Sequence, residues 1–143
     1  MNREWLENYI AMARECEHRQ ERLARMKSAE VLPPLRAGND GSQHTGSSGE
    51  HMARSVEKRL EYEEQIAPIL AENRRRMRAV EHAVCTLPPR ERDILRMRYM
   101  DSDTLRPLPW RDIATKLFGT DEKRHIDAAL RIHRAALAHY LTK

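Results

Sequence analysis

The amino-acid sequence predicts an all-α protein: a long N-terminal helical hairpin, or coiled-coil-like arm, followed by a domain of shorter helices. Three observations predict this fold. Apolar residues recur at alternating spacings of three and four in two long segments, and a stretch rich in Gly and Ser separates those segments. After residue 86, prolines and a single glycine divide the chain into shorter helical pieces.

The first long helix is expected over residues 1–32, with charged residues on the faces that flank its apolar seam. Residues 33–49 are the expected flexible linker, because Pro33 and Pro34 break a helix and four of the five glycines follow them. The seam of the first helix comprises Leu6, Tyr9, Ala13, Cys16, Gln20 and Leu23.

The second long helix is expected over residues 50–86. Pro68 lies within it and predicts either a kink or two helices in series, because proline lacks an amide hydrogen and costs about 3 kcal/mol in a helix interior. Two such helices should pack as an antiparallel hairpin, although the same seams could pair between two chains as a homodimer. The second seam comprises Ile66, Leu70, Asn73, Met77, Val80, Val84 and Leu87.

Residues 87–143 show the pattern of a helix-turn-helix domain. "PRERDILRMRYM" predicts a helix with Pro89 in its first turn, and "WRDIATKLFG" predicts a short helix that ends at Gly119. A longer helix is expected from about Asp121 to Leu141. Helix, loop, short helix, glycine turn and longer helix is the order in which the last helix enters the DNA major groove. The apolar stripe of that helix comprises Ile126, Leu130, His133, Leu137, Tyr140 and Leu141.

The positive charge is concentrated in this C-terminal part. Of 26 Lys and Arg and 22 Asp and Glu, residues 1–86 hold 14 and 14, which leaves 12 and 8 for residues 87–143. A local basic excess favours binding to a polyanion, although an ordinary solvated helix face has the same composition. Opposite the apolar stripe, the last helix carries possible groove residues: Lys123, Arg124, Asp127, Ala128, Arg131 and Arg134.

The segments "LPPRERDILRMRYM", "LPWRDIATKLFG" and "RIHRAAL" resemble region 4 of sigma-70 factors in order and spacing. They are more similar still to phage-encoded sigma-like regulators of the ArpU and RinA type, some of which carry a long helical pair with a Gly/Ser linker. "GSSGEHMARSVEKRLEYEEQI" resembles the start of the second helix of that pair. The resemblance covers residues 87–141 well and residues 46–70 loosely.

The resemblance implies a sigma region 4-like helix-turn-helix in a transcriptional activator of phage late or packaging genes. Such a protein binds double-stranded DNA in the cytoplasm of a bacterial host, at the nucleoid, and could contact RNA polymerase or a second copy of itself. Nothing matches sigma region 2, so this chain alone should not open DNA. The chain has more residues between Gly119 and "RIHRAAL" than a sigma factor has.

The resemblance also assigns roles. Arg131 matches an exposed groove-facing position and is the first choice for a base or phosphate contact. Arg124, Asp127 and Ala128 are the next groove candidates, and the role of Lys123 depends on where the recognition helix begins. Phosphate contacts are expected of three further residues: Arg111, Lys116 and Arg96.

The residues give no support for an enzyme, a cofactor or a metal. No His or Cys group has zinc spacing, no phosphate-binding glycine loop is possible, and no apolar run approaches the length of about 18 residues needed to span a membrane. His133 is expected to be a core histidine with a backbone partner. Cys16 and Cys85 are expected to be reduced core residues.

Two further features of the sequence each have two possible roles. Trp110 is expected to plug the core between the short helix and "ILRMRY", or else to contact a partner protein. The basic cluster Asn73–Arg78, "NRRRMR", could be a solvated face or touch flanking phosphates.

Two other functions are compatible with the same sequence. A helical adaptor would use the coiled-coil arm to bind another protein. A DNA-recognition subunit of a packaging or recombination machine would bind DNA without affecting transcription.

Overall fold

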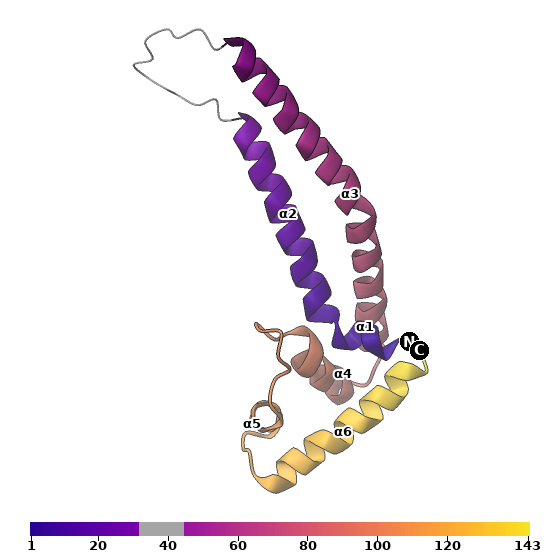
Figure 1. Ribbon diagram of the computed structural model, residues 1–143. Coiled ribbons are helices and arrows are strands. Elements are labelled where there is room, and N and C mark those ends of the chain that lie inside the picture. The colour runs from indigo at the N-terminus through magenta and orange to yellow at the C-terminus, as the bar shows by residue number, and fades with distance from the viewer. Residues whose placement is uncertain (32–44) are drawn as a thin grey trace. The chain divides into compact units, whose positions relative to one another are not determined.

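A computed structural model describes residues 1–31 and 45–143, and all the regular secondary structure in those residues is helical (Figure 1). The all-α prediction is therefore confirmed. The chain divides into two compact units: unit 1 comprises Met1–Arg14 and Asn73–Lys143, and unit 2 comprises Glu15–Glu72. The elements are α1 (Arg3–Glu7), α2 (Tyr9–Val31), α3 (Thr45–Cys85), α4 (Pro89–Leu95), the π-helical turn η1 (Arg96–Met100), α5 (Trp110–Phe118) and α6 (Lys123–Leu141).

The N-terminal segment is two helices rather than the one expected over residues 1–32. The break lies at Asn8, whose backbone φ of −97° and ψ of 7° depart from helical geometry. Asparagine favours such positions because its side chain competes for backbone hydrogen bonds. The Asn2 side chain accepts a hydrogen bond of 2.8 Å from the Glu4 amide and caps α1. The short α1 belongs to unit 1.

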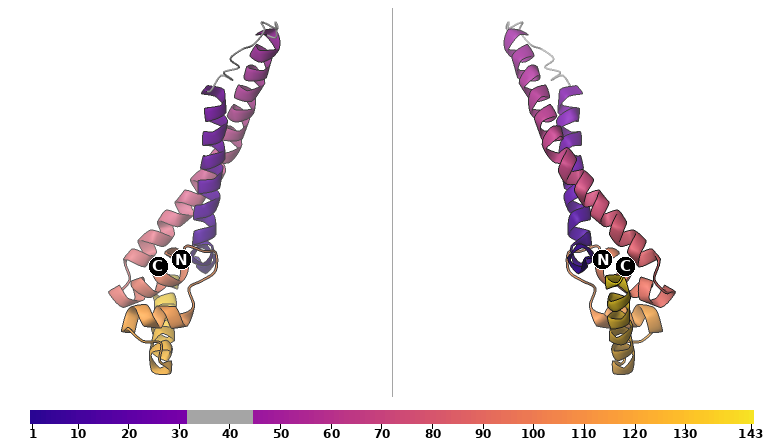
Figure 2. Two further views of the ribbon diagram at one scale, coloured as in Figure 1. Left: turned by 90° about the vertical axis from the view of Figure 1, so that its left-hand side faces the viewer. Right: turned by 90° about the vertical axis from the view of Figure 1, so that its right-hand side faces the viewer.

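In unit 2, α2 and α3 pair in antiparallel directions. Cys16, Ile66 and Leu70 form its buried core, with Leu23 and Tyr62 packed against them. These contacts place the two helices side by side, and Figure 2 shows α2 and α3 crossing each other. Along α2, Cys16 comes before Leu23, and along α3, Tyr62 comes before Ile66. In an antiparallel pair the later residue of one helix lies beside the earlier residue of the other, and this order fits such a pair.

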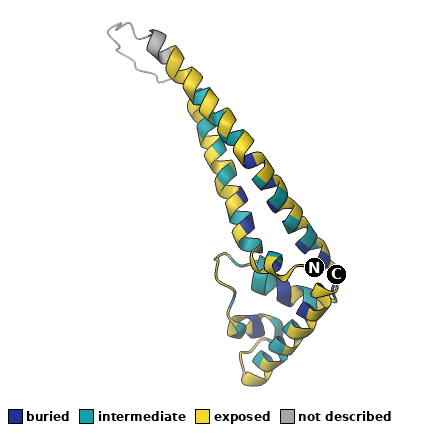
Figure 3. Ribbon diagram, turned by 45° about the vertical axis from the view of Figure 1, so that its right-hand side comes forward, coloured by how far each residue is buried: buried dark blue, intermediate teal, exposed yellow. Residues whose placement is uncertain are grey.

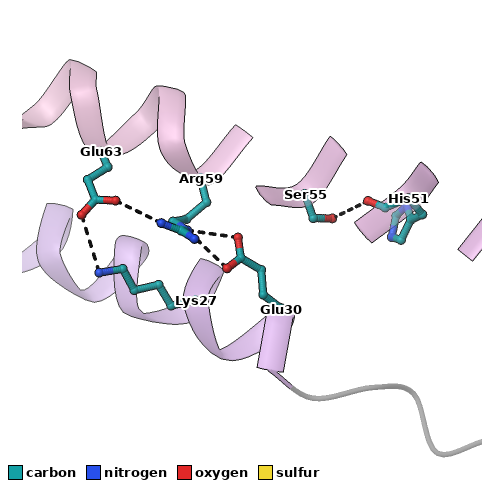
Figure 4. A network of polar contacts seen from close by, with 6 residues as sticks. All are labelled: Lys27, Glu30, His51, Ser55, Arg59 and Glu63. Atoms are coloured by element: carbon teal, nitrogen blue, oxygen red, sulfur yellow. Dashed lines mark hydrogen bonds and ion pairs between the residues drawn. The ribbon is translucent and has the colours of Figure 1, made fainter. Parts of the chain in front are cut away.

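Charged side chains join the same two helices beyond this core (Figure 4). Arg59 donates to both Glu30 carboxylate oxygens, at 3.1 and 3.2 Å, and to Glu63 at 3.2 Å. Lys27 lies 3.6 Å from Glu63 and links α2 back to α3. A network of four alternating charges orients several side chains at once, so it costs less side-chain entropy per contact than isolated pairs would.

α3 continues through Pro68 as one helix, so the alternative of two helices in series is wrong. Pro68 is exposed, and its neighbours Ile66 and Leu70 are buried. The proline ring therefore faces solvent, and the carbonyl left without a helical donor can be hydrated. Packing of the adjacent seam residues holds the helix through this position.

The linker expected over residues 33–49 falls largely outside the described residues, which resume at residue 45. Thr45 to Gly49 are helical and belong to the first turns of α3, so the helix begins five residues earlier than the predicted residue 50. Small polar residues weaken a helix by only fractions of a kcal/mol each, about 1 for glycine, and the helix that follows can extend through them.

The buried core of unit 1 combines residues from α1, α3, α4, α5 and α6. α6 packs against α4 and α5, and α1 contacts η1. This unit is larger than the domain predicted over residues 87–143, because Met1–Arg14 and the end of α3 from Asn73 onward also belong to it. The core comprises Leu6, Val80, Ala83, Val84, Leu87, Ile94, Leu95, Ile113, Ala129, Ala136, Leu137 and Tyr140.

Three positions predicted for the core or a seam lie at the surface. Gln20, assigned to the seam of the first helix, is exposed. Cys85 is exposed, whereas Cys16 is buried, and both are free thiols. Leu141 retains 46% of its accessible surface although it was assigned to the stripe of the last helix. Cys85 and Leu141 are the last residues of α3 and α6.

Gly119 ends α5 in the left-handed conformation, with φ at 81°, and its amide donates to the Thr115 carbonyl at 2.9 Å. This is the predicted helix end, and it turns the chain toward α6. No atom lies within 4 Å of a Cβ placed there. The need for glycine is therefore conformational and not steric.

We expect Gly119→Ala to lower the free energy of unfolding by about 1–2 kcal/mol, since a side chain disfavours this backbone conformation. Chemical denaturation measures the change. Gly49→Ala is the matched control, because Gly49 is helical, has equally open surroundings and should gain up to about 1 kcal/mol of helix propensity. Equal effects of the two substitutions would contradict the role of the Gly119 turn.

Candidate nucleic-acid interface

α6 has one face buried in unit 1 and one face exposed (Figure 3). Ala129, Ala136, Leu137 and Tyr140 are buried in the core. Ile126, Leu130 and His133 are half-buried at the margins. The predicted stripe is thus broadly right, but the alanines at its centre were not predicted, because their small apolar surface gives a weak periodic signal. These alanines allow α6 to approach its neighbours closely.

The exposed face of α6 carries the predicted groove residues. Lys123, Arg124, Asp127, Arg131 and Arg134 are exposed, and Ala128 is half-buried at the edge. Four cations and one carboxylate therefore share this face over three turns, and small exposed side chains, Ala135 and Ala138, lie beside them. Such a surface can approach a polyanion closely with its backbone.

α5 carries two exposed cations, Arg111 and Lys116. Arg96 does not join them. It lies in η1, where its guanidinium is 3.5 Å from Asp101 and close enough to the Tyr9 hydroxyl to influence its pKa. Eight of the nine predicted residues therefore lie on α5 and α6, six of them on the exposed side of α6, whereas Arg96 lies in η1 beside Asp101.

Two of the candidate arginines pair with carboxylates near the turn between α5 and α6. Arg111 lies 3.3 Å from Asp121, and Arg124 lies 2.9 Å from Glu122. All four side chains are more than half exposed, and ion pairs of this kind contribute at most about 1 kcal/mol. A phosphate could replace either carboxylate at little cost.

Arg131 is different from these two arginines. Among the described residues, no carboxylate lies within ion-pair distance of it, and its side chain is exposed. It is two residues before His133, which at 100° per residue puts it on nearly the opposite side of α6 from that half-buried ring. Its guanidinium is available to an external acceptor.

The sequence interpretation missed a stack at the start of α6. The Arg90 guanidinium lies 5.3 Å from the centre of the Phe118 ring, and that ring stacks on His125 at 5.2 Å. The Thr120 hydroxyl hydrogen-bonds His125 Nδ1. Arg90 from α4 is thereby placed beside the turn that precedes the basic face. The "PRER" motif contained this arginine, but sequence spacing could not relate it to Phe118, 28 residues later.

A second cluster lies where η1, α5 and α6 meet. The Arg98 guanidinium lies 4.6 Å from the centre of the Trp110 ring and donates to the Leu108 carbonyl at 2.6 Å. Trp110 meets the His133 ring edge to face at 4.7 Å. His133 Nε2 is 2.8 Å from the Tyr99 hydroxyl. Four side chains from three elements thus form one continuous contact, which we call the Arg98 cluster.

This cluster corrects one prediction and supports another. His133 is a half-buried histidine, but its partner is the Tyr99 side chain and not a backbone group. Trp110 packs against the core beside Arg98, close to the predicted plug between the short helix and "ILRMRY". Burial, reinforced by the positive charges of Arg98 and Arg3, lowers the pKa of His133 to about 4. The ring is therefore neutral at pH 7.

The basic cluster of α3 has a packing role. The guanidinium groups of Arg75 and Arg76 lie 5.3 and 5.6 Å from the centre of the Trp5 ring. Both contacts lie within unit 1 and join α3 to α1. The "NRRRMR" segment is therefore only partly a solvated face, with Arg74 and Arg78 exposed.

None of the helices within residues 1–31 and 45–143 is long and apolar enough to cross a bilayer. In that same part of the chain, no three His, Cys, Asp or Glu side chains are grouped as metal ligands. Comparisons with protein-family models, with curated proteins and with solved structures found no match. The function must therefore be argued from the site itself.

The stability of unit 1 should depend on the protonation of His133. Its pKa is about 4 in the folded chain and 6.5 ordinarily, so the unfolded chain binds more protons between these values. The free energy of unfolding should fall as the pH is lowered from 6.5 to 4. Because the ring is half-buried and solvent screens part of the effect, we expect a loss on the order of 1–2 kcal/mol.

Denaturation at several pH values measures this loss in the wild type and in His133→Phe, which keeps an aromatic ring but does not titrate. The variant should lose the part of the pH dependence that His133 contributes. Identical pH dependence in the two proteins would contradict a neutral, half-buried His133.

Proposed function

We propose that this chain is a sequence-specific, double-stranded DNA-binding transcriptional regulator that reads the major groove with α6. The observation that carries the proposal is the exposed basic face of α6, whose opposite face is anchored in the core by α4 and α5. A helix held in this way can enter a groove without leaving its own domain.

The order of the elements supports the same function. A short α5, a left-handed glycine and a longer α6 form the sequence of a helix-turn-helix, in which the first helix crosses the DNA backbone and the second contacts base edges. In this arrangement Arg131 is the first candidate for a base contact, with Arg124, Asp127 and Ala128 beside it. Lys116, Lys123, Arg111 and Arg134 are suited to phosphates.

The resemblance to sigma region 4 and to the ArpU and RinA regulators makes the proposal more specific. A regulator of this class would act on phage late or packaging genes in the cytoplasm of a bacterial host, on nucleoid DNA. It would contact RNA polymerase or a second copy of itself. It would use no cofactor and catalyse no reaction.

Arg131→Ala should weaken specific DNA binding by about 1–3 kcal/mol if the arginine pairs with a base through both nitrogens. Fluorescence anisotropy against fragments of the chain's own upstream region measures the affinity. Arg25→Ala removes the same charge from an exposed position of unit 2 and is the matched control. An Arg131 variant that binds as tightly as the control would exclude the base contact.

Phosphate contacts should appear in the salt dependence of binding. Lys116→Ala and Lys123→Ala should each reduce the slope of log affinity against log salt by about 1, because each lost contact releases one counterion fewer. They should weaken specific and non-specific DNA alike. A slope that neither substitution changes would remove both lysines from the interface.

A second candidate function rests on unit 2, where Met52 and Leu60 of α3 retain 48% and 46% of their accessible surface. Exposed apolar residues on a two-helix pair favour an adaptor that binds a further helix. Its affinity for a partner protein would depend little on salt, in contrast to DNA binding.

A DNA-recognition subunit of a packaging machine would bind DNA with the same residues but would leave transcription from the target promoter unchanged.

A further inference from the structure

We propose that the Arg98 cluster positions α6, by fixing the rotation of this helix about its own axis and hence the direction of Arg131. The inference rests on the proposed function only where DNA affinity is the readout. Arg98, Tyr99, Trp110 and His133 are positioning residues in this proposal and touch no DNA themselves.

The geometry of α6 connects the cluster to the basic face. His133 is two residues after Arg131 and nine residues after Arg124, which at 100° per residue places both arginines about 160–180° from the histidine ring. Any rotation of the ring toward α5 or η1 therefore turns the two arginines by the same angle. Leu137 and Tyr140 anchor the C-terminal part of α6 in the core, whereas the fully buried residue nearest Arg124 and Arg131 is the small Ala129, so directional contacts at His133 add resistance to rotation there.

The cluster can resist rotation because its contacts are directional. The hydrogen bond between Tyr99 and His133 holds the ring from η1, and the edge-to-face contact with Trp110 holds it from α5. Arg98 ties these two neighbours together, since it stacks on Trp110 and donates to the Leu108 carbonyl just before α5. Three elements thus meet on one ring of α6.

The polar groups of the cluster have no other evident task. Arg98 Nε is buried without a hydrogen-bond partner, and the pKa of His133 is lowered by burial. An apolar cluster would avoid both costs. The bonds that are made, between Tyr99 and His133 and from Arg98 to the Leu108 carbonyl, favour this arrangement over alternatives in which the same groups would be unpaired.

The test compares two substitutions that remove one hydroxyl each from unit 1. Tyr99→Phe removes the bond to His133, and Tyr140→Phe removes a bond of 2.9 Å from the far end of α6 to the Asn2 carbonyl. Both variants lose one hydrogen bond, so both should be destabilised similarly. Only Tyr99→Phe should change the direction of Arg131.

The first readout needs no DNA. In the NMR spectrum of the full chain, NOEs between the His133 ring and the Trp110 ring report the orientation of α6, because the two rings are 4.7 Å apart and neither is substituted. These NOEs should weaken in Tyr99→Phe and persist in Tyr140→Phe. Unchanged NOEs in Tyr99→Phe would overturn the proposal, whether or not the chain binds DNA.

The second readout is affinity for the specific DNA fragment. Tyr99→Phe should lower it by about five-fold, the size expected for one net hydrogen bond, and Tyr140→Phe should leave it unchanged. Weakened NOEs between His133 and Trp110 with unchanged affinity would overturn the positioning role. If the wild type binds no DNA, the proposed function fails, and the NMR comparison still decides whether the cluster orients α6.

A double variant, Tyr99→Phe with His133→Phe, distinguishes positioning by this pair from general damage. Replacing both partners with apolar rings leaves no polar group unsatisfied, so the double variant should lose less affinity than the product of the two single losses. Losses that simply multiply would show that the two residues act independently and would overturn the pairing on which the proposal depends.

Discussion

The close packing of α6 against α4 and α5 is the constraint on which the rest of unit 1 depends. α6 buries one face against α4 and α5, and its opposite face remains exposed. Ala129 and Ala136, both fully buried, permit this because small side chains let helix backbones approach closely. Leu137 and Tyr140, also buried, fill the contact toward the C-terminal end of α6. The aromatic and charged residues around His133 supply the directional contacts that alanines lack.

The same constraint explains why unit 1 extends beyond the short helices. α4, η1, α5 and α6 together are small, and a core of that size gains little stability from burial alone. Leu6 from α1 and Val80 and Val84 from α3 enlarge it, and all three are fully buried. The start of α2 and the end of α3 therefore belong to unit 1, and the rest of both helices belongs to unit 2.

Unit 2 is held together by a different balance of forces. Its buried core consists of Cys16, Ile66 and Leu70, so much of the pairing surface is polar. The charge network around Arg59 joins α2 to α3, and its Arg59–Glu30 pair is part-buried, with side chains only 21% and 13% exposed. The core of unit 2 is thin, and two apolar residues of α3, Met52 and Leu60, are exposed.

The sequence by itself determined the helical class, the two apolar seams, the glycine turn at Gly119 and the exposed side of α6. These follow from periodicity and local backbone preference, which act over a few residues. Only the tertiary structure decided what each seam touches. It brought Tyr99 to His133 across 34 residues, buried Ala129 and Ala136, exposed Cys85, and separated Arg96 from the other candidate cations. Such outcomes depend on contacts between elements distant in sequence, and periodicity within one helix carries no information about its neighbours.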